Sequence, residues 1–278
     1  MYELNDKESI IYNNGERFIP GITHGILELI RHRSTYVFFK NIILSDIEGK
    51  KIEGQIKVAD LGCGVGHGCV VLSDIPNVKV FGVDKSCEAL EYAIDKYNRS
   101  NIEYIADDLR HFIQEMLEYD YIVSRHAFEH ITDGLSLSIK TKWRQRLMIE
   151  VPYGEGDGNE FHVLKGITER DFSDYSGIEL FFQDINGITY NNNLKPDKPN
   201  GLIYIMSNSH IGAISSIDGI KYPIKHWEPE EIEFRQCVND YLDINRKMMD
   251  YENSISSKIN RKLAAYPKFE YLIKRVLK

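Results

Sequence analysis

In the stretch ADLGCGVGHG (residues 59–68), every second residue from position 62 onward is glycine: Gly62, Gly64, Gly66 and Gly68. The apolar run IKVADLG leads into it, and a short helical pattern follows. Glycine tolerates left-handed backbone and lets a ligand lie against the main chain, and the amides at a helix start attract polar or anionic groups. Each glycine also loses more backbone entropy on folding than another residue would. Four in alternation therefore predict a strand–loop–helix unit that holds a ligand.

The spacing of these glycines does not match G-x-G-x-x-G, the pattern by which many proteins bind dinucleotides. Counted from each of the first three glycines, that pattern needs a further glycine at position 67, 69 or 71. The chain has His67, Cys69 and Val71 there. An NAD(P)-dependent oxidoreductase is therefore the weaker interpretation of this loop.

Apolar strands alternate with helical patterns along the middle of the chain. Strands are predicted at 56–62, 78–84, 102–108, 119–126 and 146–154, with helices at 69–75, 86–98 and 109–117 between the first four. Such alternation is typical of a parallel sheet covered on both faces. Two more strands, 178–185 and 201–209, are joined only by a polar loop and should pair antiparallel. The prediction is an α/β fold with a Rossmann-like, doubly wound sheet of seven strands, mostly parallel with an antiparallel edge strand.

Helical patterns flank this sheet and divide the chain into three segments. Residues 1–50, with a helix at 22–43, are interpreted as an N-terminal lid, residues 51–215 as the ligand-binding domain, and residues 216–278 as a C-terminal helical extension. The last 28 residues hold seven Lys or Arg and two Glu. This basic tail is a candidate for contact with an acidic membrane surface, a polyanionic glycan, a partner enzyme or a second subunit. A solvated helix end is the simpler alternative.

Composition restricts the partners and the compartment. The net charge of −8 argues against general nucleic-acid binding, which relies on neutralising phosphates. The four cysteines lack metal-like spacing and are expected to be reduced. The first residues do not resemble a secretory signal, and no apolar run approaches the ~20 residues of a membrane-spanning helix. We therefore predict a cytoplasmic protein without a metal site, since His162, Asp157 and Glu160 form too weak a pattern.

With Asp60 at its start, the glycine loop reads D-x-G-x-G-x-G and resembles the first motif of class I S-adenosylmethionine-dependent methyltransferases. The resemblance implies that Asp60, Gly62, Gly64 and Gly66 bind S-adenosylmethionine, with S-adenosylhomocysteine as the product. Asp84 ends the strand VKVFGVD about 20 residues after the loop, where a carboxylate can accept both ribose hydroxyls. A helix-capping role for this carboxylate is the alternative.

Two further strand ends carry candidate site residues. In YIADDL the resemblance implies an adenine contact, and the apolar residue that follows favours Asp108 over Asp107. The fourth strand runs into SRHAFEHI, where the family has an aliphatic or aromatic residue followed by Glu-His. We interpret Glu129 and His130 as a structural, hydrogen-bonded pair. His126, at the strand's carboxyl end, is the candidate catalytic base for an acceptor hydroxyl or ammonium group, unless it only packs on the cofactor.

The stretches GERFIPG and HRSTYVFF resemble the leader segment of bacterial methyltransferases found with surface-polysaccharide and sugar-modifying enzymes. Thr35 stands where that segment has an arginine, so Arg17 or Arg33 is expected to bind the cofactor carboxylate. This resemblance alone points to a sugar, sugar nucleotide or glycan-linked group as the acceptor. Candidate acceptor contacts lie in the loop PYGEGDGNEFHV and are Tyr153, Glu155, Glu160 and His162.

Together, these features predict a methyltransferase that moves a methyl group from S-adenosylmethionine to an oxygen or nitrogen atom of such an acceptor. The acceptor's identity and the oligomeric state stay open. Beside the oxidoreductase, a non-catalytic binding module on the same fold is the second alternative.

Overall fold

The computed structural model describes residues 6–13, 17–19, 25–50, 54–157, 159–217, 221–225 and 251. The chain divides into two units, Met1–His226 and Trp227–Lys278. Tyr251 is the one described residue of the second unit, so most of the predicted C-terminal extension, and its basic tail apart from Tyr251, lies outside the described residues. The division at residues 50 and 215 stays a prediction. Within the described part, no helix combines the length and the apolarity needed to cross a membrane.

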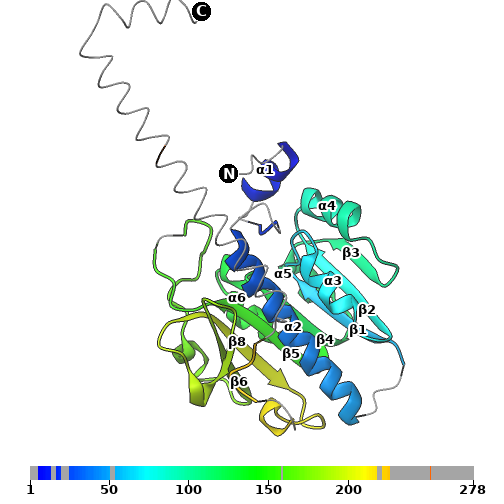
Figure 1. Cartoon of the computed structure of the whole chain (residues 1–278). Coiled ribbons are helices and arrows are strands. Elements are labelled where there is room, and N and C mark those ends of the chain that lie inside the picture. The colour runs from blue at the N-terminus through cyan, green and yellow to red at the C-terminus, as the bar shows by residue number, and fades with distance from the viewer. Residues whose placement is uncertain are drawn as a thin grey trace, which may run out of the picture. The chain divides into compact units, whose positions relative to one another are not determined.

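Five parallel strands form the first part of the sheet, in the order β3-β2-β1-β4-β5 (Figure 1). They are β1 (Ile56–Leu61), β2 (Val78–Asp84), β3 (Ile102–Ala106), β4 (Tyr119–Arg125) and β5 (Trp143–Pro152). The helices between them are α3 (His67–Ser73), α4 (Cys87–Tyr97), α5 (Leu109–Glu115) and α6 (Gly134–Ile139). The predicted parallel arrangement is confirmed.

Further strands continue the sheet past β5. β8 (Pro199–Ser207) pairs antiparallel with β5, and β6 (Ile178–Asp184) pairs antiparallel with β8, as the sequence predicts. The sheet has one strand more than the predicted seven, because the polar loop contains β7 (Thr189–Asn191), which pairs with β6. A three-residue strand has too few positions to show the alternation by which strands are predicted.

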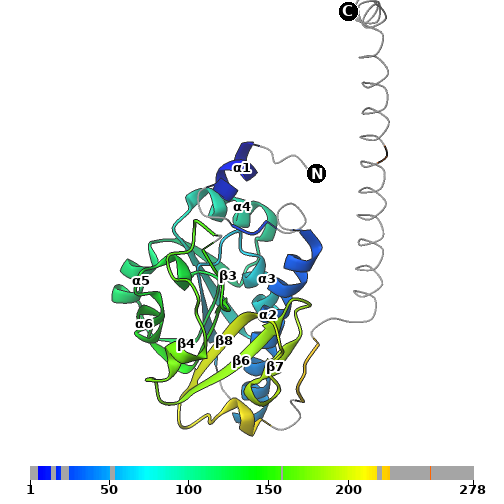
Figure 2. The same ribbon diagram turned by 90° about the vertical axis from the view of Figure 1, so that its left-hand side faces the viewer.

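Helices cover both faces of the sheet (Figure 2). On one face, Phe39 of α2 (Gly25–Lys50) and Leu72 of α3 pack in a cluster with the buried strand residues. On the other face, Phe112 of α5 and Leu137 of α6 belong to a second cluster. Apart from the edge strand β3, the parallel strands are therefore buried on both sides, which explains their nearly continuous apolar sequence.

The last turns of α2 carry a buried ion pair to the sheet. Asp46 accepts hydrogen bonds from Arg146 Nε and Nη2 of β5 at 2.7 and 2.8 Å, and both side chains are buried. The apolar pattern ends this helix at residue 43, whereas the structure extends it to Lys50. The bidentate pair anchors these additional turns, because either charge buried alone would be strongly destabilising.

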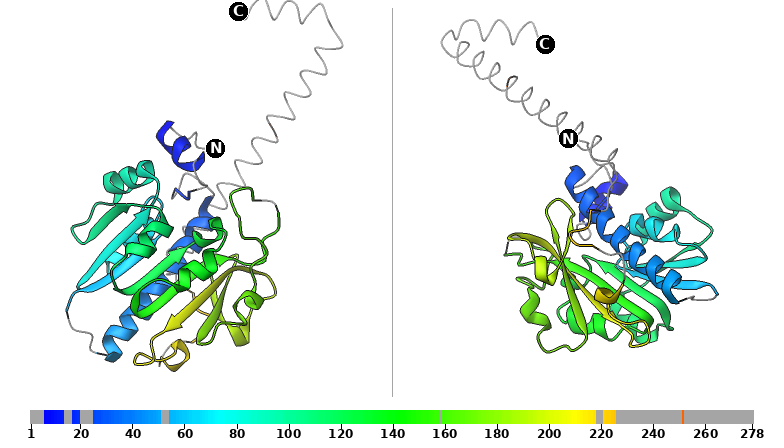
Figure 3. Two further views of the ribbon diagram at one scale, coloured as in Figure 1. Left: turned by 180° about the vertical axis from the view of Figure 1, so that it is seen from behind. Right: turned by 60° about the horizontal axis from the view of Figure 1, so that its bottom comes forward.

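A further helix, α1 (Asp6–Asn13), precedes α2 and is not predicted by the sequence pattern. Its Ile11 and the later Ile19 are fully buried and pack with Val65 of the glycine loop and Ala89 of α4. Figure 3 shows α1 beyond the end of the sheet at which the parallel strands finish. Ile11 and Ile19 of the N-terminal segment thus pack on the glycine loop, and the function of this segment as a lid stays a prediction.

Candidate functional site

The loop between β1 and α3 turns on glycines in the left-handed region. Gly62, Gly64 and Gly66 have φ angles of +76°, +53° and +80°. A Cβ at Gly62 would lie 2.3 Å from Ala127 Cβ, and one at Gly66 would lie 2.5 Å from Tyr104 Oη. A Cβ at Gly64 would meet no heavy atom within 4 Å. Packing therefore requires glycine at Gly62 and Gly66. Gly64 instead presents open main chain to an adjacent cavity of about 960 Å³, which is called the cavity below.

Asp60 lies behind this loop and is not among the residues that line the cavity. Its buried carboxylate accepts hydrogen bonds from Tyr36 Oη at 3.0 Å and from Cys69 Sγ at 3.3 Å. Burial raises the pKa of Asp60 to about 7, against the lowering effect of these hydrogen bonds. The predicted cofactor contact is thus replaced by a structural one, since Asp60 ties α2 and α3 to the start of the loop.

Asp84 ends β2 beside the loop and borders the cavity. Its Oδ2 accepts a hydrogen bond from Gly64 N at 2.9 Å. Its Oδ1 accepts hydrogen bonds from Ser86 N and from Arg17 Nη2, both at 2.9 Å. The side chain of Ser86 caps α4 by accepting a hydrogen bond from Ala89 N, so Asp84 is not the capping side chain. The structure brings together Asp84, Arg17 and the glycine loop, as the sequence predicts.

The two acidic residues that follow β3 differ in position. Asp108 lines the cavity, and its Oδ1 caps α5 by accepting a hydrogen bond from Arg110 N at 2.9 Å. Asp107 is not among the lining residues, and its Oδ1 lies 2.9 Å from Nδ1 of His111. The structure therefore places the preferred residue of the two, Asp108, at the cavity.

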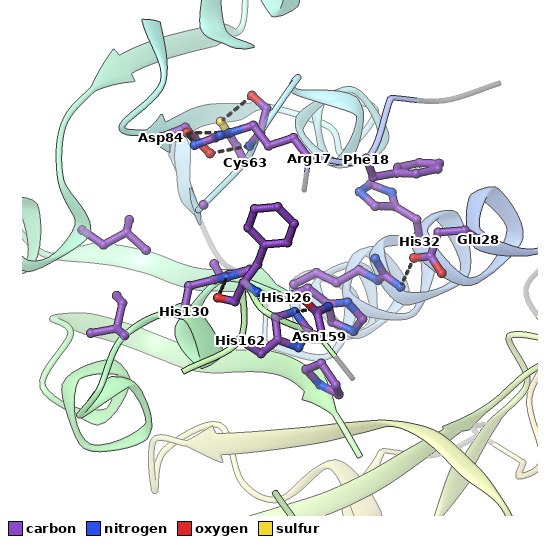
Figure 4. A pocket seen from close by; sticks show the side chains of 18 of the residues that line it. Arg17, Phe18, Glu28, His32, Cys63, Asp84, His126, His130, Asn159 and His162 are labelled. Atoms are coloured by element: carbon purple, nitrogen blue, oxygen red, sulfur yellow. Dashed lines mark hydrogen bonds and ion pairs between the residues drawn. The ribbon is translucent and has the colours of Figure 1, made fainter. Parts of the chain in front are cut away.

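Residues of the N-terminal segment complete one wall. Arg17, Phe18 and His32 line the cavity (Figure 4). The rings of Phe18 and His32 lie 4.9 Å apart, and His32 Nδ1 is 3.2 Å from Nδ1 of His67. Arg33 is not among the lining residues. Of the two arginines considered for the cofactor carboxylate, the structure thus brings Arg17 to the cavity.

His126 follows β4 and lies across the cavity from Asp84 (Figure 4). Its φ of +50° is uncommon for a residue with a Cβ, and its N–H donates to the carbonyl of Glu150 at 3.0 Å. Its Nε2 is buried with no hydrogen-bond partner among the described residues. Burial, then the charge of Arg125, lowers the pKa of His126 well below its usual value. A left-handed backbone and an unsatisfied buried nitrogen together mark a candidate functional residue.

A buried charge network behind His126 was not expected from the sequence. Arg125 is 6% exposed and forms ion pairs of 2.8 Å with Glu28 of α2 and with Glu150 of β5. Burial alone would raise the pKa of Glu28, but Arg125 and other positive groups lower it to about 2. Thr35, which replaces the arginine of the resembling segment, donates a hydrogen bond to Glu150 at 2.7 Å. Arg125 therefore supplies a cation at the cavity from the end of β4, in place of an arginine at position 35 of α2.

The loop after β5 borders the cavity from the side of His126. Tyr153, Glu155 and His162 line it as expected, whereas Glu160 does not. Asp157 pairs with Lys165 at 3.5 Å, so it does not join His162 in the weak set considered above. This loop is thus correctly predicted to face the cavity, but through only three of the four candidate residues.

Glu129 and His130 do not form the predicted hydrogen-bonded pair. Neither carboxylate oxygen of Glu129 has a hydrogen-bond partner within the described residues. His130 Nδ1 instead donates to the carbonyl of Phe161 at 2.8 Å. Each of the two residues places a potential ligand atom within 4.8 Å of the other and of one from His162. Sequence spacing could not reveal this cluster, because His162 lies more than 30 residues away.

One cavity of about 960 Å³ joins these groups. It lies beyond the ends of β1, β2 and β4, where the strand order reverses and open α/β sheets bind ligands. The residues present fit S-adenosylmethionine. Gly64 leaves open main chain for a close approach, Asp84 offers a carboxylate at the position expected for ribose, and Asp108 offers one toward the expected adenine end.

Comparisons with known proteins agree with this assignment. Residues 58–145 match the family model described as a methyltransferase domain. Malonyl-[acyl-carrier protein] O-methyltransferase of Acetivibrio thermocellus is 28% identical over 89 residues, which are 32% of this chain and 30% of that protein. Phosphoethanolamine N-methyltransferase 2 of Caenorhabditis elegans is 28% identical over 113 residues, 38% of this chain and 26% of that protein. The match spans less than a third of the length of these curated relatives.

Among solved structures, the plantazolicin methyltransferase BpumL, in complex with S-adenosylhomocysteine and a monoazolic desmethylPZN analogue, has a TM-score of 0.47 and 15% identity. The alignment covers 73% of this chain and 91% of that one. The family match includes β1 to β4, the glycine loop and Asp84, which are the elements that build the cavity wall described above. Residues 58–145 of this chain thus match a methyltransferase domain.

Proposed function

We propose that this protein transfers a methyl group from S-adenosylmethionine to an oxygen or nitrogen atom of a sugar, sugar nucleotide or glycan-linked group, in the cytoplasm and during surface-polysaccharide synthesis. The observation that carries the methyl-transfer part is the cavity of about 960 Å³, which has Asp84 and the glycine loop on one side and His126 on the other. The acceptor class rests on the resemblance of residues 15–21 and 32–39 to sugar-modifying methyltransferases.

Residues on the glycine-loop side would hold the cofactor. The main chain at Gly62 and Gly64 would lie along it, Asp84 would accept hydrogen bonds from the ribose, and Asp108 would meet the adenine. Arg17 already contacts Asp84 and is placed to bind the cofactor carboxylate. When bound, S-adenosylmethionine supplies a methyl group on a positively charged sulfur. The chain's own part is to align this group with the acceptor and to exclude water.

His126 would act on the acceptor. Because its pKa is lowered, the imidazole is neutral at physiological pH, and one ring nitrogen accepts a hydrogen bond. An acceptor hydroxyl or ammonium group that donates to this nitrogen is oriented by it and loses its proton to it as the methyl group arrives. The backbone hydrogen bond to Glu150 and the adjoining Arg125 network hold the residue in place.

The test is transfer of an isotopically labelled methyl group. The purified chain is incubated with labelled S-adenosylmethionine and a panel of sugar phosphates, nucleotide sugars and oligosaccharides, and the products are analysed by mass spectrometry. Label in a sugar-containing product supports the proposal. Label only in acceptors that lack a sugar overturns the acceptor class, and binding of the cofactor without any transfer favours the non-catalytic module.

Two substitutions separate the residue roles. His126→Asn tolerates the left-handed backbone and should lower turnover by about 10²- to 10⁴-fold with little change in cofactor affinity. His210→Asn is the matched control, since His210 bonds to Gln145 and does not line the cavity. Undiminished turnover in His126→Asn would remove His126 from the mechanism.

The cofactor side is tested in the same way. Asp84→Asn should weaken S-adenosylhomocysteine binding by about 10- to 100-fold in calorimetry, because hydrogen bonds to a charged group contribute about 1.5–3 kcal/mol. Asp107→Asn, at a neighbouring strand end but not among the lining residues, should leave the affinity unchanged. Binding of NADH in place of S-adenosylhomocysteine would support the oxidoreductase instead.

A further inference from the structure

Two elements far apart in the sequence bring Glu129, His130 and His162 together. Glu129 and His130 belong to the short helix η1 (Phe128–His130) after β4, and His162 lies in the loop after β5. The N–H groups of Val163 and Leu164 donate to the carbonyl of Glu129 at 3.0 and 2.9 Å. The loop is therefore bonded directly to η1, and Figure 4 shows His130 and His162 on the same side of the cavity.

The side-chain atoms of these three residues are close enough to share one ligand. A potential metal-binding atom of each lies within 4.8 Å of those of the other two, and Glu129 Oε1 is 3.8 Å from His162 Nε2. Ligand atoms around one ion at about 2.1 Å lie roughly 3–3.5 Å apart. Small side-chain rotations, of about 1 Å at the ligand atoms, would complete such a site.

Both imidazoles are oriented through Nδ1. His130 Nδ1 donates to the carbonyl of Phe161 at 2.8 Å, and His162 Nδ1 donates to the carboxylate of Glu155. In this tautomer the lone pair is on Nε2. Metal-binding histidines are typically held in this way, with the other ring nitrogen bonded to a carbonyl or a carboxylate. Asn159 Nδ2 lies 3.3 Å from His162 Nε2, a contact that an ion would replace.

Glu129 gives an independent indication of a missing cation. Its side chain is fully buried, and neither carboxylate oxygen has a hydrogen-bond partner within the described residues. Burying a carboxylate without partners is costly, and buried charges are normally paired or coordinate a metal. Its Oε1 lies 3.8 Å from His162 Nε2, beyond hydrogen-bonding distance, and Arg125 acts on the carboxyl only through its charge.

We propose that Glu129, His130 and His162 bind one divalent transition-metal ion, such as Zn²⁺ or Mn²⁺. Two imidazoles and one carboxylate are ligands suited to such ions, and three protein ligands leave positions open. His130 and His162 line the cavity, whereas Glu129 is not among the lining residues. The open positions therefore face the cavity. If the proposed function holds, they would take an oxygen atom of the acceptor, which favours hydroxyl over amine acceptors.

Metal binding can be measured without any acceptor. The full chain, stripped with a chelator, is titrated with ZnCl₂ or MnCl₂ in a calorimeter, and bound Mn²⁺ is observed by electron paramagnetic resonance. We expect one ion per chain. His162→Ala should weaken binding by about 100-fold or more, and Glu155→Gln by about 10- to 100-fold, the range for groups that orient a ligand. His210→Ala, a histidine outside the cluster, should bind as the wild type does.

The absence of one-to-one binding in the folded wild type would overturn the proposal, as would equal affinities of His162→Ala and His210→Ala. Circular dichroism checks folding, and where His162→Ala does not fold, Glu129→Gln answers the same question with a side chain of equal size. S-adenosylhomocysteine binding in the same samples separates this inference from the proposed function. Ion binding without cofactor binding supports the metal site but contradicts the methyltransferase, and the reverse result contradicts the metal site alone.

Discussion

Alanine substitutions at Gly62 and Gly64, in the same loop, should damage different properties of the protein. Gly62 and Gly64 both have positive φ, so each substitution adds a left-handed backbone cost of about 1–2 kcal/mol. At Gly62 the new methyl group would also lie 2.3 Å from Ala127 Cβ, whereas at Gly64 it would project into open space beside the cavity. One substitution should therefore damage folding, and the other should damage ligand binding.

The magnitudes follow from these contacts. Overpacking in a well-packed interior costs about 1–3 kcal/mol, so Gly62→Ala should lower the free energy of unfolding by about 2–5 kcal/mol. Gly64→Ala should lower it by only about 1–2 kcal/mol. Forcing the same methyl group against a bound cofactor would cost about 1–3 kcal/mol of binding, which is roughly a 5- to 150-fold loss of affinity for S-adenosylhomocysteine.

Gly177→Ala is the matched control for backbone strain. Gly177 has φ +78° and no heavy atom within 4 Å of the added Cβ, and it is exposed and not among the residues that line the cavity. Urea unfolding followed by intrinsic fluorescence measures stability, and calorimetry measures affinity. Gly177→Ala should match Gly64→Ala in stability and the wild type in affinity. Equal affinities of Gly64→Ala and Gly177→Ala would refute the assignment of Gly64 to the cofactor.

Other predictions concern stability. Asp60 keeps its proton in the native state up to about pH 7 but loses it near pH 4 in the unfolded state. Its contribution to the free energy of unfolding is therefore present below pH 4 and is lost as the pH rises to 7. Relative to Asp60→Asn, the wild type should lose about 4 kcal/mol over this range in urea unfolding, and parallel pH profiles would contradict the raised pKa. Ser86→Ala removes the N-cap of α4 and should cost about 1 kcal/mol, measured by thermal unfolding. Arg146→Met leaves Asp46 buried without its partner and should cost about 3–5 kcal/mol in urea unfolding, partly recovered by adding Asp46→Asn.

Local sequence patterns predicted much of the fold. Apart from β3, the parallel strands are buried on both faces, so their apolar runs are easily recognised, and the bounds of β2 agree with the prediction. The N-cap of α4 is likewise a local feature, because Ser86 bonds to an N–H three residues later. The end of α2, the helix α1 and the strand β7 could not be predicted in this way. They are stabilised by long-range contacts such as Asp46–Arg146, which leave no periodic signal.

The sequence by itself determined the cofactor side of the site. There the loop glycines and Asp84 belong to one strand–loop–helix–strand unit, and their spacing reflects local geometry. Only the tertiary structure decided the rest. It placed Asp60 behind the loop, supplied the cation of Arg125 where Thr35 lacks one, and joined His162 to Glu129. Side chains that meet only after distant segments pack together are not specified by any spacing along the chain.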